Sequence, residues 1–224
     1  MQTQQDTYHR IAKYYERALG KRLAPLRGNI RTFIHYKGHR RILDLCCGTG
    51  KQLQMLAAPG MKLWGLDSSR AMLAQAERRP DISYILGDAS SIPFREKSFD
   101  AVILTLALHE KPLEQQQKIL RQAWDCLRPG GHLILADFCR VPSTVRGWIM
   151  AKAVLPAIER FAGHEHFANY SSWMKSGALE SVIDGFSTRK NLISSHFSGT
   201  VAVCSLENEA YDKNVFLSLN KPIG

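Results

Sequence analysis

The sequence has no run of about eighteen apolar residues, so it predicts no membrane-spanning helix. Residues 1–6 lack the basic-then-apolar pattern of an export signal, and we therefore expect a cytoplasmic protein. The five cysteines include no C-x-x-C pair and are odd in number, which favours reduced thiols over a metal centre or a disulfide framework. No internal repeat is present, and a length of 224 residues favours a single domain.

A strand-like segment near the start of the chain runs into a glycine turn. Residues 41–45 are mostly apolar, with Asp44 near their end, and Gly48 and Gly50 follow directly before helix-forming residues 51–58. A strand, a glycine turn and a helix bring bare backbone against a nucleoside-containing ligand at the carboxyl edge of an α/β sheet. The segment therefore predicts a ligand site.

The same loop lacks the residues of the common phosphate-binding motifs. A dinucleotide fingerprint needs a third glycine three residues after Gly50, where this chain has Leu53. A Walker loop needs glycine and Ser/Thr at positions that hold Leu45 and Gln52. Two glycines behind an acidic residue suit a ligand with a ribose and no phosphate, and S-adenosylmethionine is such a ligand.

Two further strand-like segments also end in acidic residues. Residues 62–66 lead to Asp67, twenty-three residues after Asp44, which is close to the spacing at which an acidic side chain accepts hydrogen bonds from ribose hydroxyls. Residues 82–86 lead to Gly87, Asp88 and Ala89. Three strands that each end in an acid indicate one polar edge of a parallel sheet. Ser68 and Ser69 offer an N-cap for a helix over residues 70–76.

Four motifs resemble the successive motifs of class I S-adenosylmethionine-dependent methyltransferases. They are DLCCGTG at residues 44–50, LDSS at 66–69, GDASSIPF at 87–94 and LRPGG at 127–131. Within this class the chain is most similar to the ubiquinone/menaquinone-biosynthesis methyltransferase group, whose members begin with a segment similar to YHRIAKYY at residues 8–15 that closes over the cofactor. The likeness covers about residues 8–138. The sequence departs from the usual pattern of the family at Cys46, where glycine or alanine is commoner.

The resemblance implies an α/β, Rossmann-like, doubly wound sheet of seven strands, mostly parallel with a reversed last strand. A small helical cap is expected between strands five and six, with helices at residues 144–160 and 170–183 around a polar loop at 163–166. We expect residues 1–224 to form one methyltransferase domain. Its parts are a basic helical segment at 1–40, the cofactor-binding core at 41–138, the cap at 139–186, a strand pair at 187–207 and a tail at 208–224.

The motifs also imply which residues hold S-adenosylmethionine and its product S-adenosylhomocysteine. Asp44, Cys46, Gly48 and Gly50 shape the loop beneath the amino-acid end, and Asp67 takes the ribose. The remaining members of the predicted set are Ser68, Met72, Asp88, Ala89 and Tyr15, with Asp88 and Ala89 reaching the adenine. Met72 has ordinary core packing as an alternative to packing on the adenine ring.

The best candidate for a catalytic side chain is His109, with Glu110 beside it at the end of the fourth strand. An imidazole titrates near physiological pH and suits proton removal from the methyl acceptor, while the alternative is a histidine that only hydrogen-bonds its loop. The chain has Ala107-Leu108-His109-Glu110 where methyltransferases of nucleobase amines carry an Asp/Asn-Pro-Pro-Tyr tetrad, so we expect no such substrate. His164 and His166 lack a third ligand, and no metal is predicted.

The net charge of +10 is concentrated in residues 1–41, where ten basic residues against two acidic ones give +8. Three alternatives stay open for this segment: a solvated helical face, a peripheral contact with anionic lipid, and RNA binding, with lipid ranked above RNA. The apolar and aromatic content of residues 144–174 suits a lipophilic substrate, and the alternative is that these side chains form the small core of the cap itself. We predict an S-adenosylmethionine-dependent methyltransferase that acts on a small or medium lipophilic acceptor, quinol-like or lipid-like. The alternatives are an RNA-modifying methyltransferase and a non-catalytic S-adenosylmethionine-binding protein.

Overall fold

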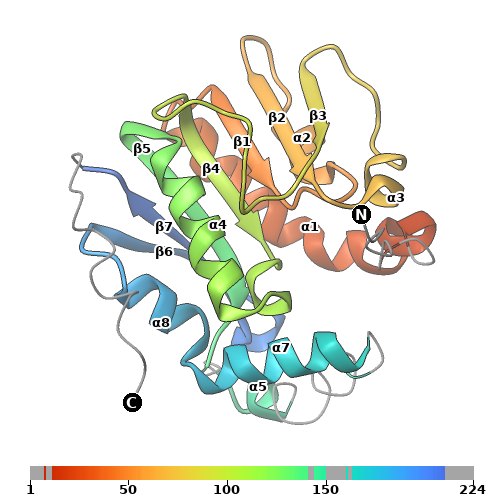
Figure 1. The fold of residues 1–224 in the computed structure, drawn as a ribbon, viewed down its shortest axis with the longest axis vertical. Coiled ribbons are helices and arrows are strands. Elements are labelled where there is room, and N and C mark those ends of the chain that lie inside the picture. The colour runs from red at the N-terminus through yellow and green to blue at the C-terminus, as the bar shows by residue number, and fades with distance from the viewer. Residues whose placement is uncertain (1–7, 9–11, 141–143, 150–159, 161–162, 210–224) are drawn as a thin grey trace.

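A computed structural model of the chain describes residue 8 and residues 12–140, 144–149, 160 and 163–209. Its centre is a seven-stranded sheet in the order β3-β2-β1-β4-β5-β7-β6 (Figure 1). The strands are β1 (Arg41–Leu45), β2 (Lys62–Asp67), β3 (Ile82–Leu86), β4 (Phe99–Thr105), β5 (Leu127–Phe138), β6 (Lys190–His196) and β7 (Val201–Glu207).

The pairing of the strands confirms the predicted Rossmann-like topology. Strands β1 to β5 run parallel to one another, whereas β7 lies between β5 and β6 and is antiparallel to both. Strand β4 is buried along nearly its whole length, as its almost unbroken apolar sequence predicts for a central strand covered on both faces. The carboxyl ends of the five parallel strands therefore meet at one edge of the sheet.

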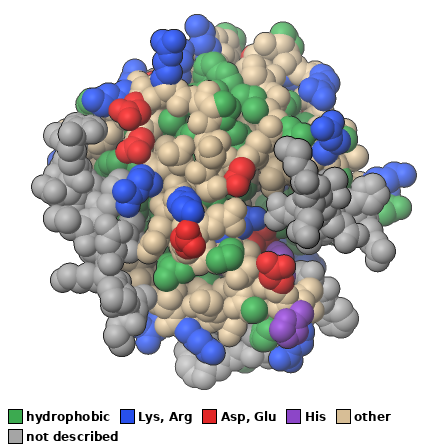
Figure 2. Space-filling model, in the orientation of Figure 1, with side chains coloured by type: hydrophobic (Ala, Val, Ile, Leu, Met, Phe, Trp, Pro, Cys, Tyr) green, Lys and Arg blue, Asp and Glu red, His purple; other side chains and the backbone are tan. Residues whose placement is uncertain are grey.

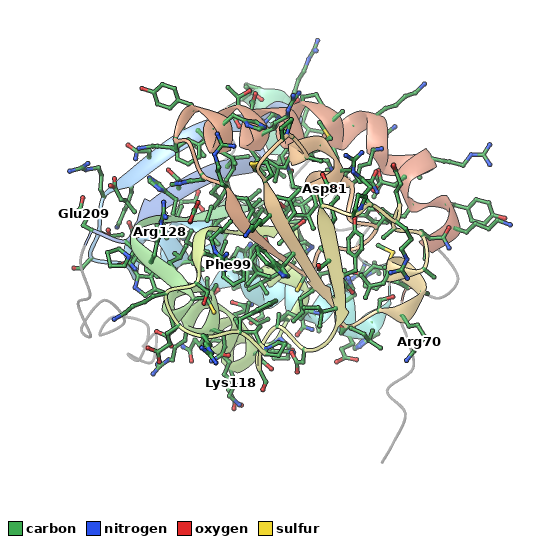
Figure 3. All side chains as sticks on the ribbon, turned by 90° about the horizontal axis from the view of Figure 1, so that it is seen from above. Arg70, Asp81, Phe99, Lys118, Arg128 and Glu209 are labelled. Carbon is green, nitrogen blue, oxygen red and sulfur yellow. The ribbon has the colours of Figure 1, made fainter. Side chains whose placement is uncertain are left out.

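Helices cover both faces of the sheet (Figure 3). Helix α1 (Ala12–Tyr36) and α2 (Lys51–Leu56) lie on one face, while α4 (Leu113–Asp125) lies on the other. Helix α1 buries Leu26, Ile30 and Ile34, which are spaced four residues apart on one side of the helix. Helix α1, which makes up most of the described part of the basic segment, thus contributes to the core.

The cap differs from the sequence-based prediction in two respects. The expected loop at residues 163–166 is wrong, because His164 begins α7 (His164–Lys175). The single helix expected at residues 170–183 is also wrong, because Gly177 has φ +105 and separates α7 from α8 (Ala178–Asp184). Left-handed backbone of this kind favours glycine and ends a helix.

The first cap helix is described only at α5 (Val145–Ile149), and the rest of the helix expected at residues 144–160 falls outside the described residues, apart from residue 160. Helices α5 and α7 lie beyond the carboxyl ends of the strands (Figure 1). The cap therefore stands over the sheet edge at which a ligand is expected. Among the described residues, no helix is both long enough and apolar enough to cross a bilayer.

Candidate active site

A pocket lies at the carboxyl edge of the sheet, where the loop after β1 meets the ends of β2 and β4 and the start of α1. Most of the predicted cofactor residues line it: Tyr15, Asp44, Cys46, Gly48, Asp67, Ser68 and Met72. Other predicted residues do not. Asp88 and Ala89 follow β3 outside the described lining, so their contact with adenine stays a prediction. Gly50 does not line the pocket either and is the left-handed N-cap of α2.

The carboxylate of Asp67 joins two loops of the pocket. Its Oδ2 accepts a hydrogen bond from the backbone N–H of Gly48 at 2.7 Å, and its Oδ1 accepts one from Ser69 N–H at 2.8 Å. Ser69 in turn caps α3 (Arg70–Leu73) by accepting from Met72 N–H, as predicted from the sequence. Burial raises the pKa of Asp67, and the two backbone donors work against that rise.

Left-handed backbone shapes the glycine loop. Gly48 and Gly50 have φ of +56 and +69, and Cys46 has φ +57 although it carries a side chain. A non-glycine residue with left-handed backbone costs about 1–2 kcal/mol, so the glycine loop holds Cys46 in a strained conformation. Leu106, which also lines the pocket, has φ +51. Strained residues of this kind gather at functional sites.

The pocket also contains buried polar groups that lack partners. Asp44 is 2% exposed, and no hydrogen bond from the described residues reaches its carboxylate. Burial therefore raises the pKa of Asp44 to about 8. Gln52 Oε1 and Thr105 Oγ1 likewise have no partner among the described residues. Unpaired buried groups are costly, so a ligand with complementary polar atoms would be stabilised here. An ammonium group is the natural complement of the Asp44 carboxylate.

Helix α1 closes one side of the pocket through an ion pair that sequence analysis missed. Arg27 and Glu16 form two hydrogen bonds of 2.8 and 2.9 Å, and Glu16 Oε1 accepts a third from Thr49 Oγ1 at 2.7 Å. Arg27 and Thr49 are buried, and Gln52 donates to the Arg27 carbonyl at 3.3 Å. These contacts fix α1 to the glycine loop.

The predicted catalytic residue His109 does not line the pocket. Its side chain is buried, and Nδ1 lies 2.7 Å from Oδ1 of Asp137 at the end of β5. The other oxygen of Asp137 accepts from the backbone N–H groups of Leu108 and His109. This geometry supports the loop-positioning alternative, and a role for His109 in proton removal stays a prediction.

Its neighbour Glu110 does line the pocket. Glu110 ends the short helix η1 (Leu108–Glu110), and its carboxylate contacts Tyr8 from the amino-terminal segment and His166 from α7. Three elements that are far apart in the sequence therefore meet at one carboxylate. The sequence predicted that a histidine and an acidic residue follow β4, but it did not indicate which of the two side chains faces the pocket.

Replacing Cys46 by glycine should raise the free energy of unfolding by about 0.5–1 kcal/mol, because glycine adopts positive φ without strain. Urea unfolding measures this, with Cys47→Gly as the matched control, since Cys47 has no positive φ. Cys47→Gly should destabilise the protein. Equal destabilisation by both substitutions would contradict strain at Cys46.

Comparison with known proteins agrees with this geometry. Residues 42–131 match the methyltransferase domain family. A demethylmenaquinone methyltransferase of Renibacterium salmoninarum is 38% identical over 100 residues, which are 44% of this chain and 41% of that protein. A demethylmenaquinone methyltransferase of Clavibacter sepedonicus is 30% identical over 164 residues, 63% of this chain and 66% of that protein. The chain thus matches less than two thirds of the length of either relative.

The plantazolicin methyltransferase BpumL, solved in complex with SAH, shares the fold with a TM-score of 0.61 at 16% identity, over 88% of this chain and 90% of that one. The predicted resemblance to class I S-adenosylmethionine-dependent methyltransferases, and among them to the menaquinone group, is confirmed. Residues 42–131 of this chain match the methyltransferase domain family, and the seven-stranded sheet has the Rossmann-like fold of that class.

Proposed function

We propose that the protein transfers a methyl group from S-adenosylmethionine to a small or medium lipophilic acceptor with quinol-like chemistry. The observation that carries the proposal is the pocket at the carboxyl edge of the sheet, within the part of the chain that matches the methyltransferase domain family. Asp44 and Asp67 both line this pocket, and no described residue donates a hydrogen bond to the Asp44 carboxylate. The Asp44 carboxylate suits the ammonium group of this cofactor, and the Asp67 carboxylate suits its ribose. The quinol-like acceptor is supported by the names of the two relatives.

The residues present fit the cofactor. Asp44 would pair with its ammonium group, Asp67 would accept hydrogen bonds from its ribose, and Met72 would offer an apolar surface. When bound, the cofactor supplies an activated methyl group, so the protein's task is chiefly to align the acceptor and to take up a proton. The absence of a Cβ at Gly48 matters here, because an added Cβ would lie 3.2 Å from Met72 Cε and would force the Met72 side chain to shift.

Labelled methyl transfer tests the activity. The protein is incubated with methyl-labelled S-adenosylmethionine and either a total lipid extract or total RNA, and the label is followed into each fraction. We expect the label in an organic-soluble product at moderate salt. Label in RNA that falls steeply as salt rises would instead support an RNA methyltransferase, because phosphate contacts are salt-sensitive. Cofactor binding without any product would support a non-catalytic binding protein.

The raised pKa of Asp44 predicts that cofactor affinity depends on pH. The cofactor's ammonium favours the Asp44 carboxylate, so binding must remove a proton while the pH is below about 8. The affinity for S-adenosylhomocysteine should therefore rise up to about tenfold per pH unit between pH 6.5 and 8. Calorimetry in buffers of different ionisation enthalpy measures both the affinity and the released proton. Asp44→Asn should abolish the slope, and a slope that survives this substitution would contradict the assignment.

The proposal includes a peripheral contact of α1 with an anionic membrane surface. On the face that carries α4, acidic and basic side chains are interspersed (Figure 2). Helix α1 lies on the opposite face of the sheet (Figure 3), and its exposed charged side chains are all basic: Lys13, Arg17, Lys21, Arg22 and Arg31. The exposed apolar residues Tyr14 and Leu19 lie among them. Each basic residue near anionic lipid contributes about 1 kcal/mol.

Replacing Lys13, Arg17, Lys21 and Arg22 by Gln should therefore weaken sedimentation with phosphatidylserine vesicles by at least tenfold. A matched variant replaces Lys62, Arg70, Arg95 and Arg121, which are exposed and lie outside α1. It removes the same charge, so it should bind vesicles nearly as the unmodified protein does. Equal binding by both variants, or no binding by the unmodified protein, would remove the membrane contact from the proposal.

A further inference from the structure

The pocket contains a contact between a phenol and a carboxylate that the cofactor assignments do not use. The hydroxyl of Tyr8 lies 2.6 Å from both carboxylate oxygens of Glu110. Both side chains line the pocket beside Asp67 and Met72. Tyr8 is connected to α1 through its carbonyl oxygen, which accepts a hydrogen bond from Ala12 N–H at 2.9 Å.

The protonation states make this contact a donor–acceptor pair. Burial, followed by the charge of Glu110, raises the pKa of Tyr8 far above its ordinary value, so the phenol keeps its proton. Burial alone would raise the pKa of Glu110 as well. The hydrogen bond from His166, the positive charge that His109 and His166 can carry, and the hydrogen bond from Tyr8 outweigh it, and the pKa of Glu110 is lowered. Glu110 is therefore a carboxylate.

Glu110 is held firmly by the cap. His166 Nε2 lies 3.2 Å from Glu110 Oε1, and Asn169 Nδ2 donates to the Glu110 backbone carbonyl at 2.8 Å. Both residues belong to α7, which stands over the carboxyl ends of the strands (Figure 1). The titratable side chains that interact with the carboxylate include Tyr8, His109 and His166, and also Tyr15, Cys46 and Asp67. Lys111 lines the same pocket. A fixed acceptor at this position can orient a bound hydroxyl group.

We propose that Glu110 accepts the hydroxyl proton of the methyl acceptor, and that the Tyr8 phenol occupies the position of that hydroxyl while the acceptor is absent. The inference rests on the proposed function and assigns to Glu110 the proton of the acceptor's phenolic or enolic hydroxyl. The Tyr8 side chain is an aromatic ring with a hydroxyl that already fits between the cap and the cofactor residues. Its charge-assisted hydrogen bond to Glu110 holds it there.

The proton leaves the acceptor during methyl transfer and not before it. A phenol that donates to this carboxylate keeps its proton, as Tyr8 does. As the acceptor gains the methyl group, its hydroxyl loses electron density and becomes acidic. The O–H bond then breaks, its electron pair stays on the acceptor, and the proton binds a Glu110 oxygen. One proton is released for each methyl group transferred, so Glu110 must return its proton to solvent before the next turnover.

The test uses 1-naphthol, a fluorescent phenol, and 1-methoxynaphthalene, which has the same rings but no hydroxyl. Both are titrated into the full chain in the presence of excess S-adenosylhomocysteine. Tyr8→Phe removes only the competing hydroxyl, so it should bind 1-naphthol at least fivefold more tightly than the unmodified protein. Tyr14→Phe is the matched control, because Tyr14 is 57% exposed and does not line the pocket, and it should leave this affinity unchanged.

Glu110→Gln should bind 1-naphthol at least tenfold more weakly than the unmodified protein, whereas Glu110→Asp, which keeps the carboxylate, should recover part of the affinity. 1-Methoxynaphthalene should bind all variants equally weakly. Equal affinity of Tyr8→Phe and the unmodified protein for 1-naphthol would overturn the proposal, as would unchanged affinity in Glu110→Gln. The contact would then be a structural link between the amino-terminal segment and the cap.

Binding of S-adenosylhomocysteine to each variant separates this result from the proposed function. We expect its affinity to stay within threefold in all of them, which also shows that the variants fold. Failure of the unmodified protein to bind S-adenosylhomocysteine would contradict the proposed function itself. A normal cofactor affinity with no effect of Tyr8→Phe or Glu110→Gln on 1-naphthol would contradict only the role of Glu110.

Discussion

The carboxylate of Asp67 holds together the two turns that form the floor of the pocket. It accepts the backbone N–H of Gly48 from the loop after β1 and that of Ser69 from the turn after β2. These two turns come from neighbouring parallel strands, and Cys47 N–H adds a hydrogen bond to Leu66 O. The left-handed residues Cys46, Gly48 and Gly50 can follow their sharp path because both ends of the loop are fixed in this way.

Two other elements complete the pocket from outside the sheet. Helix α1 is fixed to the glycine loop through Glu16, Arg27 and Thr49, so the side of the pocket is built by a helix that precedes the core in sequence. The cap reaches the same pocket through His166 and Glu110. The floor of the pocket therefore belongs to the sheet edge, whereas its walls come from α1 and from Glu110, which α7 contacts.

The sequence predicted the core well because strands in a parallel sheet have simple patterns. Apolar runs that end in Asp44 and Asp67 mark the carboxyl edge, and the glycines mark the loop that must approach a ligand. The N-cap at Ser69 was equally predictable, since a serine before a helix-forming run has a local physical reason. The hydrophobic pattern of a strand and the capping of a helix depend on residues that are close together in the sequence. The strands, the glycine loop and the N-cap could therefore be predicted from short segments alone.

The contacts of α1 and of the cap could not be predicted in the same way. A charge-rich helix does not reveal that Arg27 is the basic residue that faces inward. His109 and Glu110 are adjacent, and the orientation of one helical turn decides that Glu110 enters the pocket while His109 pairs with Asp137. The break at Gly177 had a visible signal, the glycine itself, which was outweighed by the helical periodicity around it.

Titration calorimetry of S-adenosylmethionine with Asp67→Ala tests the central claim most directly. Each charge-assisted hydrogen bond to ribose contributes about 1.5–3 kcal/mol, so the loss of two should weaken binding by at least about a hundredfold. Asp81→Ala is a suitable control, because Asp81 pairs with Arg79 just before β3 and does not line the pocket. It should bind the cofactor like the unmodified protein. Unchanged affinity in a folded Asp67→Ala protein would contradict the cofactor site described here.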